Sequence, residues 1–197
     1  MPTERPRYFS KRLLRLAGLP LSISIICLLL QLSEPGSSQW LRYERTPIIN
    51  GEWWRLLSGN FVHLSWEHLL MNLAGLALIW LLLERLLTLG QWLTVITGSS
   101  LAVGLGLLIF NPQIDWYVGL SGMLHGMFVA GLIQNIRRGY RLEWLLLAAL
   151  IAKLIWEQFN GALPGSTELA GGSVIVDAHL YGALGGLLAW LFNRPSA

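Results

Sequence analysis

Four polar residues stand in stretches of the chain that are otherwise apolar: His68, Asn72, Ser121 and His179. A serine hydroxyl becomes a nucleophile when an imidazole takes its proton, and N–H donors stabilise the oxyanion that forms when the serine attacks a carbonyl carbon. His68 and Asn72 are four residues apart, so they share one face of a helix and present two donors to one point. Together the four residues have the parts needed for acyl transfer.

Ser121 lies between two glycines of the segment 119–122, where the sequence predicts the junction of a loop with a helix. Backbone N–H groups at such a junction lack helical partners and point at an approaching group. Glycine pairs at 122 and 126 and at 182 and 186 would let two helices approach closely. We therefore expect Ser121 and His179 to lie within hydrogen-bonding distance.

No carboxylate is expected behind the histidine. Asp177 is two residues from His179 in the sequence, and residues with that spacing project from different sides of a helix. The sequence therefore predicts a catalytic dyad of Ser121 and His179, in which no acidic side chain contacts the imidazole.

The composition places these residues in a membrane protein. Hydrophobic residues make up 54% of the 197 residues and charged residues only 13%, against roughly 25% charged residues in a soluble domain. The shortage of charge excludes a soluble globular domain, and the mean hydropathy of +0.53 with ten tryptophans excludes a disordered chain. The single cysteine, Cys27, cannot form a disulfide within the chain and is expected to be a buried thiol.

Six apolar runs are long enough to cross a bilayer, which needs about 20 residues of helix. Because backbone groups in lipid must be hydrogen-bonded within their own segment, the predicted fold is all-α and polytopic, a bundle of six transmembrane helices over 13–193 with a cytoplasmic segment 1–12 and a cytoplasmic tail 194–197. The first run is taken as an anchor and not as a cleaved signal peptide, because it is long and no A-x-A-like site follows it. The runs cover approximately 13–32, 65–84, 90–110, 120–137, 142–159 and 173–193.

The positions of the basic residues predict the orientation of the chain. With a cytoplasmic N-terminus, ten of the fourteen lysines and arginines lie on the cytoplasmic side, including Arg5, Arg85, Arg137 and Arg194, as the positive-inside rule requires. Both termini are then cytoplasmic, and the tryptophan-rich connection 33–64 is an interfacial structure on the outer side. Every even-numbered run starts at the outer face, so the four polar residues are expected at one shallow depth.

The sequence resembles the rhomboid family of intramembrane serine proteases over residues 52–186. This resemblance implies a six-helix bundle with a water-filled cavity that opens outward, and it requires neither a metal nor an organic cofactor. It implies that Ser121 is the nucleophile and His179 the base, that His68, Asn72 and the Ser121 backbone N–H bind the oxyanion, and that Gly119 and Gly122 support the site. The motifs that carry the resemblance are Glu52-Trp53-Trp54-Arg55, His68-x-x-x-Asn72, Gly119-x-Ser121-Gly122 and Ala178-His179-x-x-Gly182-x-x-x-Gly186.

His125 departs from the pattern of the family. Four residues after the serine most rhomboids have a tyrosine that packs on the catalytic imidazole, and here that position is His125. His125 shares a helical face with Ser121 and is therefore an alternative base. We expect instead that it packs on or hydrogen-bonds His179 and sets its tautomer, as a supporting residue.

The segment Gly-Leu-Ser-Gly-Met-Leu-His at 119–125 and the small size of the chain also resemble the rhombosortases of Gram-negative bacteria. That resemblance implies a protease of the inner membrane whose active site opens to the periplasm. Its partners would be the lipid bilayer and exported proteins anchored by a C-terminal tail, with a Gly-Gly-type motif, a hydrophobic helix and a basic end. Nucleic acid is not expected as a partner.

Other functions remain as alternatives. The protein could be a general rhomboid protease with other clients, or a rhomboid-like protein that binds clients without cutting them, although such relatives usually lose the serine or the histidine. A haem protein would use His68, His125 and His179 as axial ligands. A transporter is disfavoured because no repeat and no chain of carboxylates is visible in the six runs.

Overall fold

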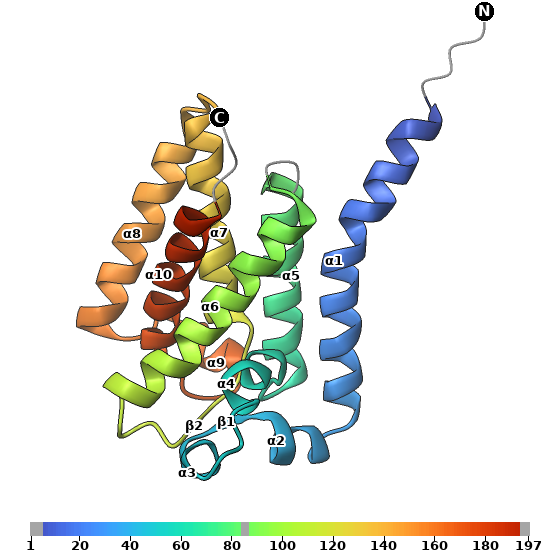
Figure 1. The fold of residues 1–197 in the computed structure, drawn as a ribbon. Coiled ribbons are helices and arrows are strands. Elements are labelled where there is room, and N and C mark those ends of the chain that lie inside the picture. The colour runs from blue at the N-terminus through green and yellow to red at the C-terminus, as the bar shows by residue number, and fades with distance from the viewer. Residues whose placement is uncertain (1–5, 84–86, 194–197) are drawn as a thin grey trace, which may run out of the picture.

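The protein is a helical bundle, described by a computed structural model over residues 6–83 and 87–193 (Figure 1). One long helix overlaps each predicted apolar run, which confirms the all-α class. Arg5, Arg85, Arg194 and the tail 194–197 lie outside the described residues, as does the beginning of the segment 1–12. The long helices are α1 (Pro6–Leu32), α5 (Trp66–Leu83), α6 (Leu89–Phe110), α7 (Ser121–Arg137), α8 (Leu142–Asn160) and α10 (Val176–Phe192).

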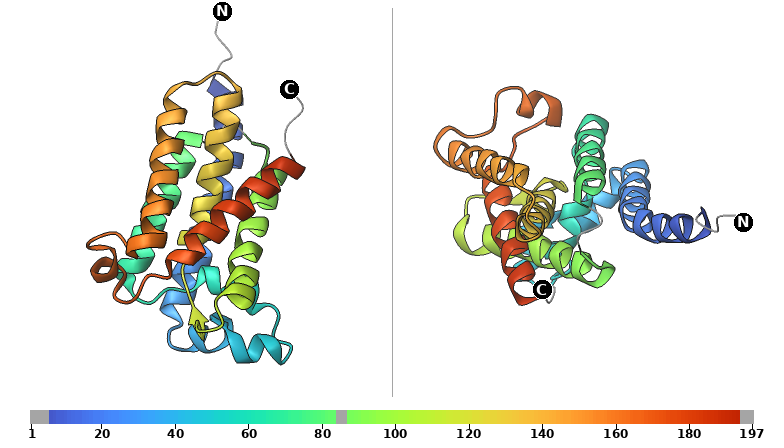
Figure 2. Two further views of the ribbon diagram at one scale, coloured as in Figure 1. Left: turned by 90° about the vertical axis from the view of Figure 1, so that its left-hand side faces the viewer. Right: turned by 90° about the horizontal axis from the view of Figure 1, so that it is seen from above.

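Two of the described helices, α5 and α6, are long and apolar enough to cross a membrane by length and composition. The part of α1 from residue 18 onward and α10 are apolar but slightly shorter. The start of α1 and the end of α10 lie at the same end of the bundle, and the short elements gather at the opposite end (Figures 1 and 2).

The short elements form a folded connection between α1 and α5. A two-stranded antiparallel sheet ties this connection to the segment before Ser121, because Tyr43 pairs with Tyr117 and Glu44 with Trp116. The elements are α2 (Gly36–Leu41), β1 (Tyr43–Glu44), α3 (Arg45–Ile49), α4 (Arg55–Ser58) and η1 (Gly59–Phe61), with β2 (Trp116–Tyr117) and α9 (Ser166–Ala170) later in the chain.

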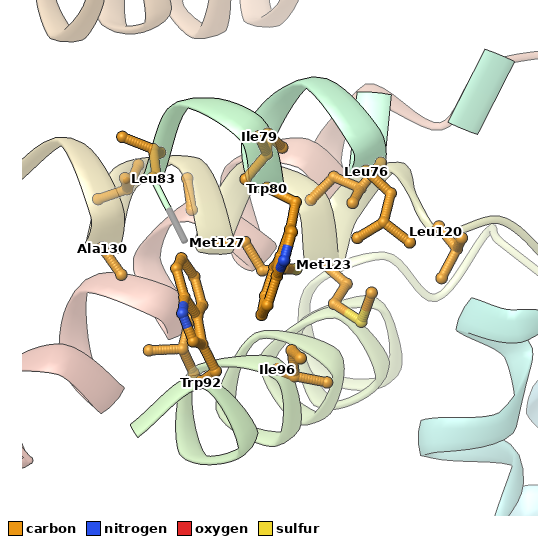
Figure 3. Close-up of a cluster of buried hydrophobic side chains, with 14 of the residues drawn as sticks. Leu76, Ile79, Trp80, Leu83, Trp92, Ile96, Leu120, Met123, Met127 and Ala130 are labelled. Atoms are coloured by element: carbon orange, nitrogen blue, oxygen red, sulfur yellow. The ribbon is translucent and has the colours of Figure 1, made fainter. Parts of the chain in front are cut away.

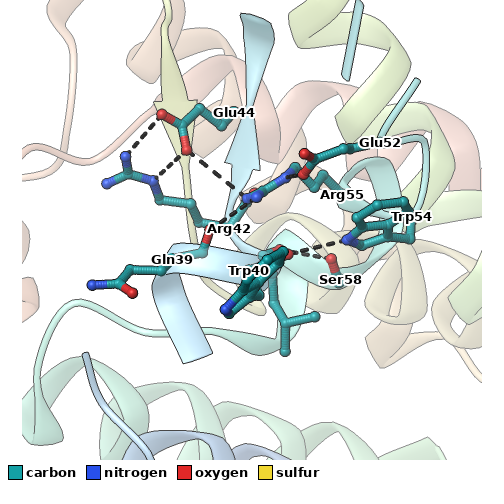
Figure 4. A network of polar contacts seen from close by, with 9 residues as sticks. Gln39, Trp40, Arg42, Glu44, Glu52, Trp54, Arg55 and Ser58 are labelled. Carbon is teal, nitrogen blue, oxygen red and sulfur yellow. Dashed lines mark hydrogen bonds and ion pairs between the residues drawn. The ribbon is translucent and has the colours of Figure 1, made fainter. Parts of the chain in front are cut away.

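Arg55 holds this connection together from inside (Figure 4). Its guanidinium is only 4% exposed; it donates to the carbonyl oxygens of Arg42 at 3.0 Å and Gln39 at 2.8 Å, and pairs with Glu52. Such a fork satisfies several buried acceptors at once. The Trp54 indole also donates to the Trp40 carbonyl at 3.0 Å. The motif at 52–55 thus makes contacts within the connection and holds its elements together.

Arg55→Ala is expected to lower the free energy of unfolding by about 3 kcal/mol, because the acceptors that Arg55 contacts would lose their hydrogen-bond donor. Arg42→Ala is the matched control: Arg42 also pairs with Glu44, but the two side chains are 35% and 30% exposed, and exposed pairs contribute at most about 1 kcal/mol. Denaturant unfolding in detergent micelles measures both variants. Equal losses in the two would contradict the structural role of Arg55.

Glycines bring α7 and α10 into contact, as the sequence predicted. A Cβ atom on Gly122 would lie 2.7 Å from the Ala178 carbonyl oxygen, and one on Gly182 would overlap the Gly122 carbonyl. Only glycine permits this approach of the two backbones. α10 also packs on α6.

The apolar core lies where α5, α6 and α7 meet (Figure 3). Trp80 of α5 and Trp92 of α6 place their ring centroids 5.4 Å apart, and Met123 and Met127 of α7 are fully buried in the same cluster. Cys27 of α1 is buried at the edge of this core, which confirms the expected buried thiol. This packing fixes the position of α7, and therefore that of Ser121 at its start.

Candidate active site

Ser121 and His179 come together where α7 and α10 begin. Ser121 is the first residue of α7, and His179 lies in the first turn of α10. The Ser121 hydroxyl is 3.0 Å from Nε2 of His179, and His179 is 5% exposed. A hydroxyl and an imidazole nitrogen at this distance can act as a nucleophile and its general base.

His68 and Asn72 lie on the first turns of α5, beside the same serine. The backbone N–H of Leu64 donates to Nδ1 of His68 at 3.4 Å, so the proton of that ring is on Nε2, for which the described part of the chain shows no acceptor. Nδ2 of Asn72 is buried and has no hydrogen-bond partner among the described residues. A buried unpaired donor is costly, and Nδ2 of Asn72 with Nε2 of His68 beside it could bind an oxyanion.

Gly119 lets these donors come close to the chain before Ser121. Its φ is +123°, and a Cβ atom there would lie 2.9 Å from Nε2 of His68. A side chain would therefore both strain the backbone and displace the imidazole.

His63 supports His68 from the loop before α5. Its ring packs edge-on against that of His68, with centroids 5.1 Å apart. Burial lowers the pKa of His63 to about 3, so this ring is neutral at physiological pH and adds no charge beside the donors.

His125 has both ring nitrogens occupied. Nδ1 is 2.7 Å from the Ser121 carbonyl oxygen, and Nε2 is 2.8 Å from the Lys153 ammonium. A carbonyl only accepts and an ammonium only donates, so Nδ1 carries the proton and the Nε2 lone pair is taken by Lys153. No lone pair remains for the serine hydroxyl. The ring also stacks on that of His179, with centroids 4.3 Å apart and planes at 17°.

The expectation that no carboxylate contacts the base is wrong. Oε2 of Glu157, on α8, is 2.9 Å from Nδ1 of His179, while Asp177 accepts a hydrogen bond from Asn111 at 2.6 Å. The sequence carried a signal for Glu157, because Glu157 and Lys153 are two ionisable residues four apart in an apolar run. Ionisable residues are costly within a membrane, and those that occur there usually pair with one another and mark a functional site.

Lys153 occupies the centre of this group of side chains. Ligand-type atoms of His125, Glu157 and His179 lie within 4.8 Å of one another, a spacing that could hold a metal ion. The Lys153 ammonium lies among them, 2.7 Å from Glu157, 2.8 Å from His125 and 3.4 Å from His179. A cation of the chain itself therefore takes that place.

Two cavities border Ser121 and His68. One, of about 370 Å³, is mostly apolar and is lined by α5, α7 and α8, with Met71, Leu78, Phe128 and Leu150 among its residues. The other, of about 500 Å³, lies against the loop segments 113–118 and 170–175. A reacting group can reach the serine from an apolar side, and water from the side of the loops.

Comparison with known proteins agrees with this geometry. Residues 50–195 match the family described as the rhomboid domain. The chain belongs to the rhomboid family. The enzyme class predicted from the sequence, an intramembrane serine protease, is that of its family. Rhomboids are multi-pass membrane proteins that act on membrane protein substrates.

Individual relatives are 26% to 31% identical to this chain over the residues that align. YdcA of Bacillus subtilis, which carries a rhomboid protease name, is 28% identical over 72% of this chain and 67% of its own length. Rhomboid-like protein 11 of Arabidopsis thaliana, a chloroplast protein, is 31% identical over 74% and 55%. The rhomboid protease GlpG of Salmonella choleraesuis is 26% identical over 75% and 51%. The chain thus spans about half to two thirds of the length of these relatives.

Proposed function

We propose that this protein is an intramembrane serine endopeptidase that cuts exported, membrane-anchored proteins near the outer end of a transmembrane segment. The observation that carries the proposal is the contact of Ser121 Oγ with His179 Nε2, at 3.0 Å, beside two donors that are held for an acceptor. Ser121 is the nucleophile and His179 the base. His68 and Asn72 bind the oxyanion, with Gly119, Gly122 and His125 in support.

Six helices cross the inner membrane in this proposal: α1, α5, α6, α7, α8 and α10. The residues of the site lie near the starts of α5, α7 and α10. These helices start at the end of the bundle where the folded connection lies (Figure 1). With both termini in the cytoplasm, this end faces the periplasm. Exposed tryptophans of the connection, Trp40, Trp53 and Trp54, suit the headgroup layer of the outer leaflet.

The reaction follows from the contacts of the site. Nε2 of His179 takes the Ser121 proton as Oγ bonds to the carbonyl carbon of the client, and His68, Asn72 and the Ser121 backbone N–H stabilise the oxyanion. His179 then gives the proton to the leaving amine, and the carbon–nitrogen bond breaks. Water reaches the acyl-enzyme through the cavity beside the loops and loses a proton to His179 as its oxygen bonds to the acyl carbon. The bond from that carbon to Oγ then breaks, His179 returns the proton to Oγ, and the new carboxylate leaves.

The client enters from the lipid in this proposal. The apolar cavity of about 370 Å³ runs beside α5 and α8 and ends at the site, so a transmembrane segment can lie in it while its outer end bends toward Ser121. Glycines near the scissile bond would favour this bend, because they cost a helix about 1 kcal/mol each relative to alanine. A C-terminal tail with a Gly-Gly-type motif, an apolar helix and a basic end, as in clients of rhombosortases, fits this requirement.

Co-expression with two model substrates tests the proposal. One carries the Gly-Gly, apolar and basic tail, and the other a generic transmembrane segment with small residues at its outer end. We expect a new C-terminus, mapped by mass spectrometry, on the first substrate only, and none with Ser121→Ala. The product mass distinguishes hydrolysis from transfer to an amine. Cutting of the second substrate would indicate a general rhomboid protease, and cutting of neither would overturn the proposed activity.

A further inference from the structure

An ion pair on α8 lies directly behind the base. Glu157 is 3% exposed and Lys153 is 26% exposed, and their charged atoms are 2.7 Å apart. The same carboxylate oxygen contacts Nδ1 of His179 at 2.9 Å. On the basis of the proposed function, we propose that Glu157 is a positioning residue that holds His179 in its reactive tautomer, and that Lys153 holds Glu157 in place.

The acceptor character of Glu157 decides where the proton of His179 lies. A carboxylate paired with an ammonium only accepts hydrogen bonds, so Nδ1 of His179 must donate to it. The lone pair of the neutral ring is then on Nε2, the nitrogen that faces Ser121 Oγ at 3.0 Å. The carboxylate also stabilises the imidazolium that forms when His179 takes the serine proton.

Lys153 does not compete for the base. Its ammonium is 3.4 Å from Nδ1 of His179, but 2.7 Å from Glu157 and 2.8 Å from Nε2 of His125. The two short contacts use two of its three protons, and a protonated Nδ1 offers no lone pair to the third.

Through these contacts α8 restrains the His179 ring both at its edge and on its face. Glu157 binds the edge of the ring at Nδ1, and His125, which Lys153 contacts, stacks on its face at 4.3 Å. A ring held by an in-plane hydrogen bond and by a stacked partner keeps the orientation that proton transfer requires. Breaking one of the two restraints leaves the other, so the expected loss from removing the carboxylate is smaller than in triads without such stacking.

A measurement on the unmodified protein tests the tautomer. The chain has four histidines, so a sample labelled with ¹⁵N-histidine gives few ring signals, and His179→Ala identifies those of His179. We expect Nδ1 of His179 to be protonated and Nε2 to be unprotonated at neutral pH. A protonated Nε2 would overturn the proposal, and this result does not depend on the folding of a Glu157 variant.

The rate at which a fluorophosphonate labels the serine tests the consequence. Glu157→Gln is expected to slow labelling about 10²-fold, which is less than the roughly 10⁴-fold loss known when an Asp of a triad is replaced by Asn. Glu157→Asp keeps the carboxylate and should recover part of the rate. Glu143→Gln is the matched control, because Glu143 lies on the same helix and contacts Asn135, away from the serine.

The outcomes separate the two proposals. If the unmodified protein labels no faster than Ser121→Ala, the proposed function fails. If it labels and Glu157→Gln labels equally fast, only the role of Glu157 fails. An ion pair that merely stabilised the bundle would lower the melting temperature of Glu157→Gln without changing the ring tautomer of His179, which the ¹⁵N spectrum would show.

Discussion

His179→Ala is expected to lower the rate of client cleavage on the order of 10⁴ to 10⁶-fold, as the loss of the general base does in other serine proteases. His179 is the ring whose free nitrogen faces Ser121 Oγ, at 3.0 Å. His125 has Nδ1 on the Ser121 carbonyl and Nε2 on Lys153, and cannot take the serine proton in this arrangement.

His125→Tyr is the matched variant and is expected to keep measurable activity. A tyrosine ring can take over the stacking on His179, although the contacts with the Ser121 carbonyl and Lys153 change. Both variants are compared by the rate at which the new C-terminus of the model substrate appears. Activity that survives in His179→Ala and is lost in His125→Tyr would reverse the assignment of the base.

Asn72→Ala is expected to lower kcat by about 10² to 10³-fold, the usual effect of removing one oxyanion donor. Asn72 is 3% exposed, and its Nδ2 has no partner among the described residues, so this donor is available for a charge that appears only during the reaction. An interaction made only in the transition state changes kcat and leaves KM nearly unchanged.

The control for Asn72→Ala is Asn160→Ala. Asn160 is at the end of α8, where its amide donates to the carbonyl of Trp156 at 3.1 Å. Steady-state kinetics with the tailed substrate measure kcat and KM separately for both variants. A rise in KM with unchanged kcat in Asn72→Ala would mean that Asn72 binds the client and not the oxyanion.

The helices and the central pair could be predicted from the sequence because the signals are local. Long apolar runs locate the six long helices, and glycines four apart at 122 and 126 and at 182 and 186 predict the close packing that brings Ser121 to His179. The tautomer of His68, by contrast, depends on the hydrogen bond from the Leu64 N–H to Nδ1, a loop contact that no sequence pattern specifies.

Glu157 was missed because its role depends on the rotation of a whole helix. The sequence shows Glu157 and Lys153 four residues apart, and therefore on one face of α8, but not which neighbour that face meets. The short elements between α1 and α5 were unpredictable for a related reason: segments of four to six residues show no periodicity, and contacts of Arg55 with distant carbonyls determine their arrangement.

The most direct test of the account is to locate the group that a fluorophosphonate modifies in the membrane-embedded protein. Peptide mass spectrometry after labelling should find one adduct, on Ser121, and should find none in His179→Ala over the same time. An adduct on another serine, or no adduct on Ser121 in the unmodified protein, would contradict the claim that Ser121 is a nucleophile activated by His179.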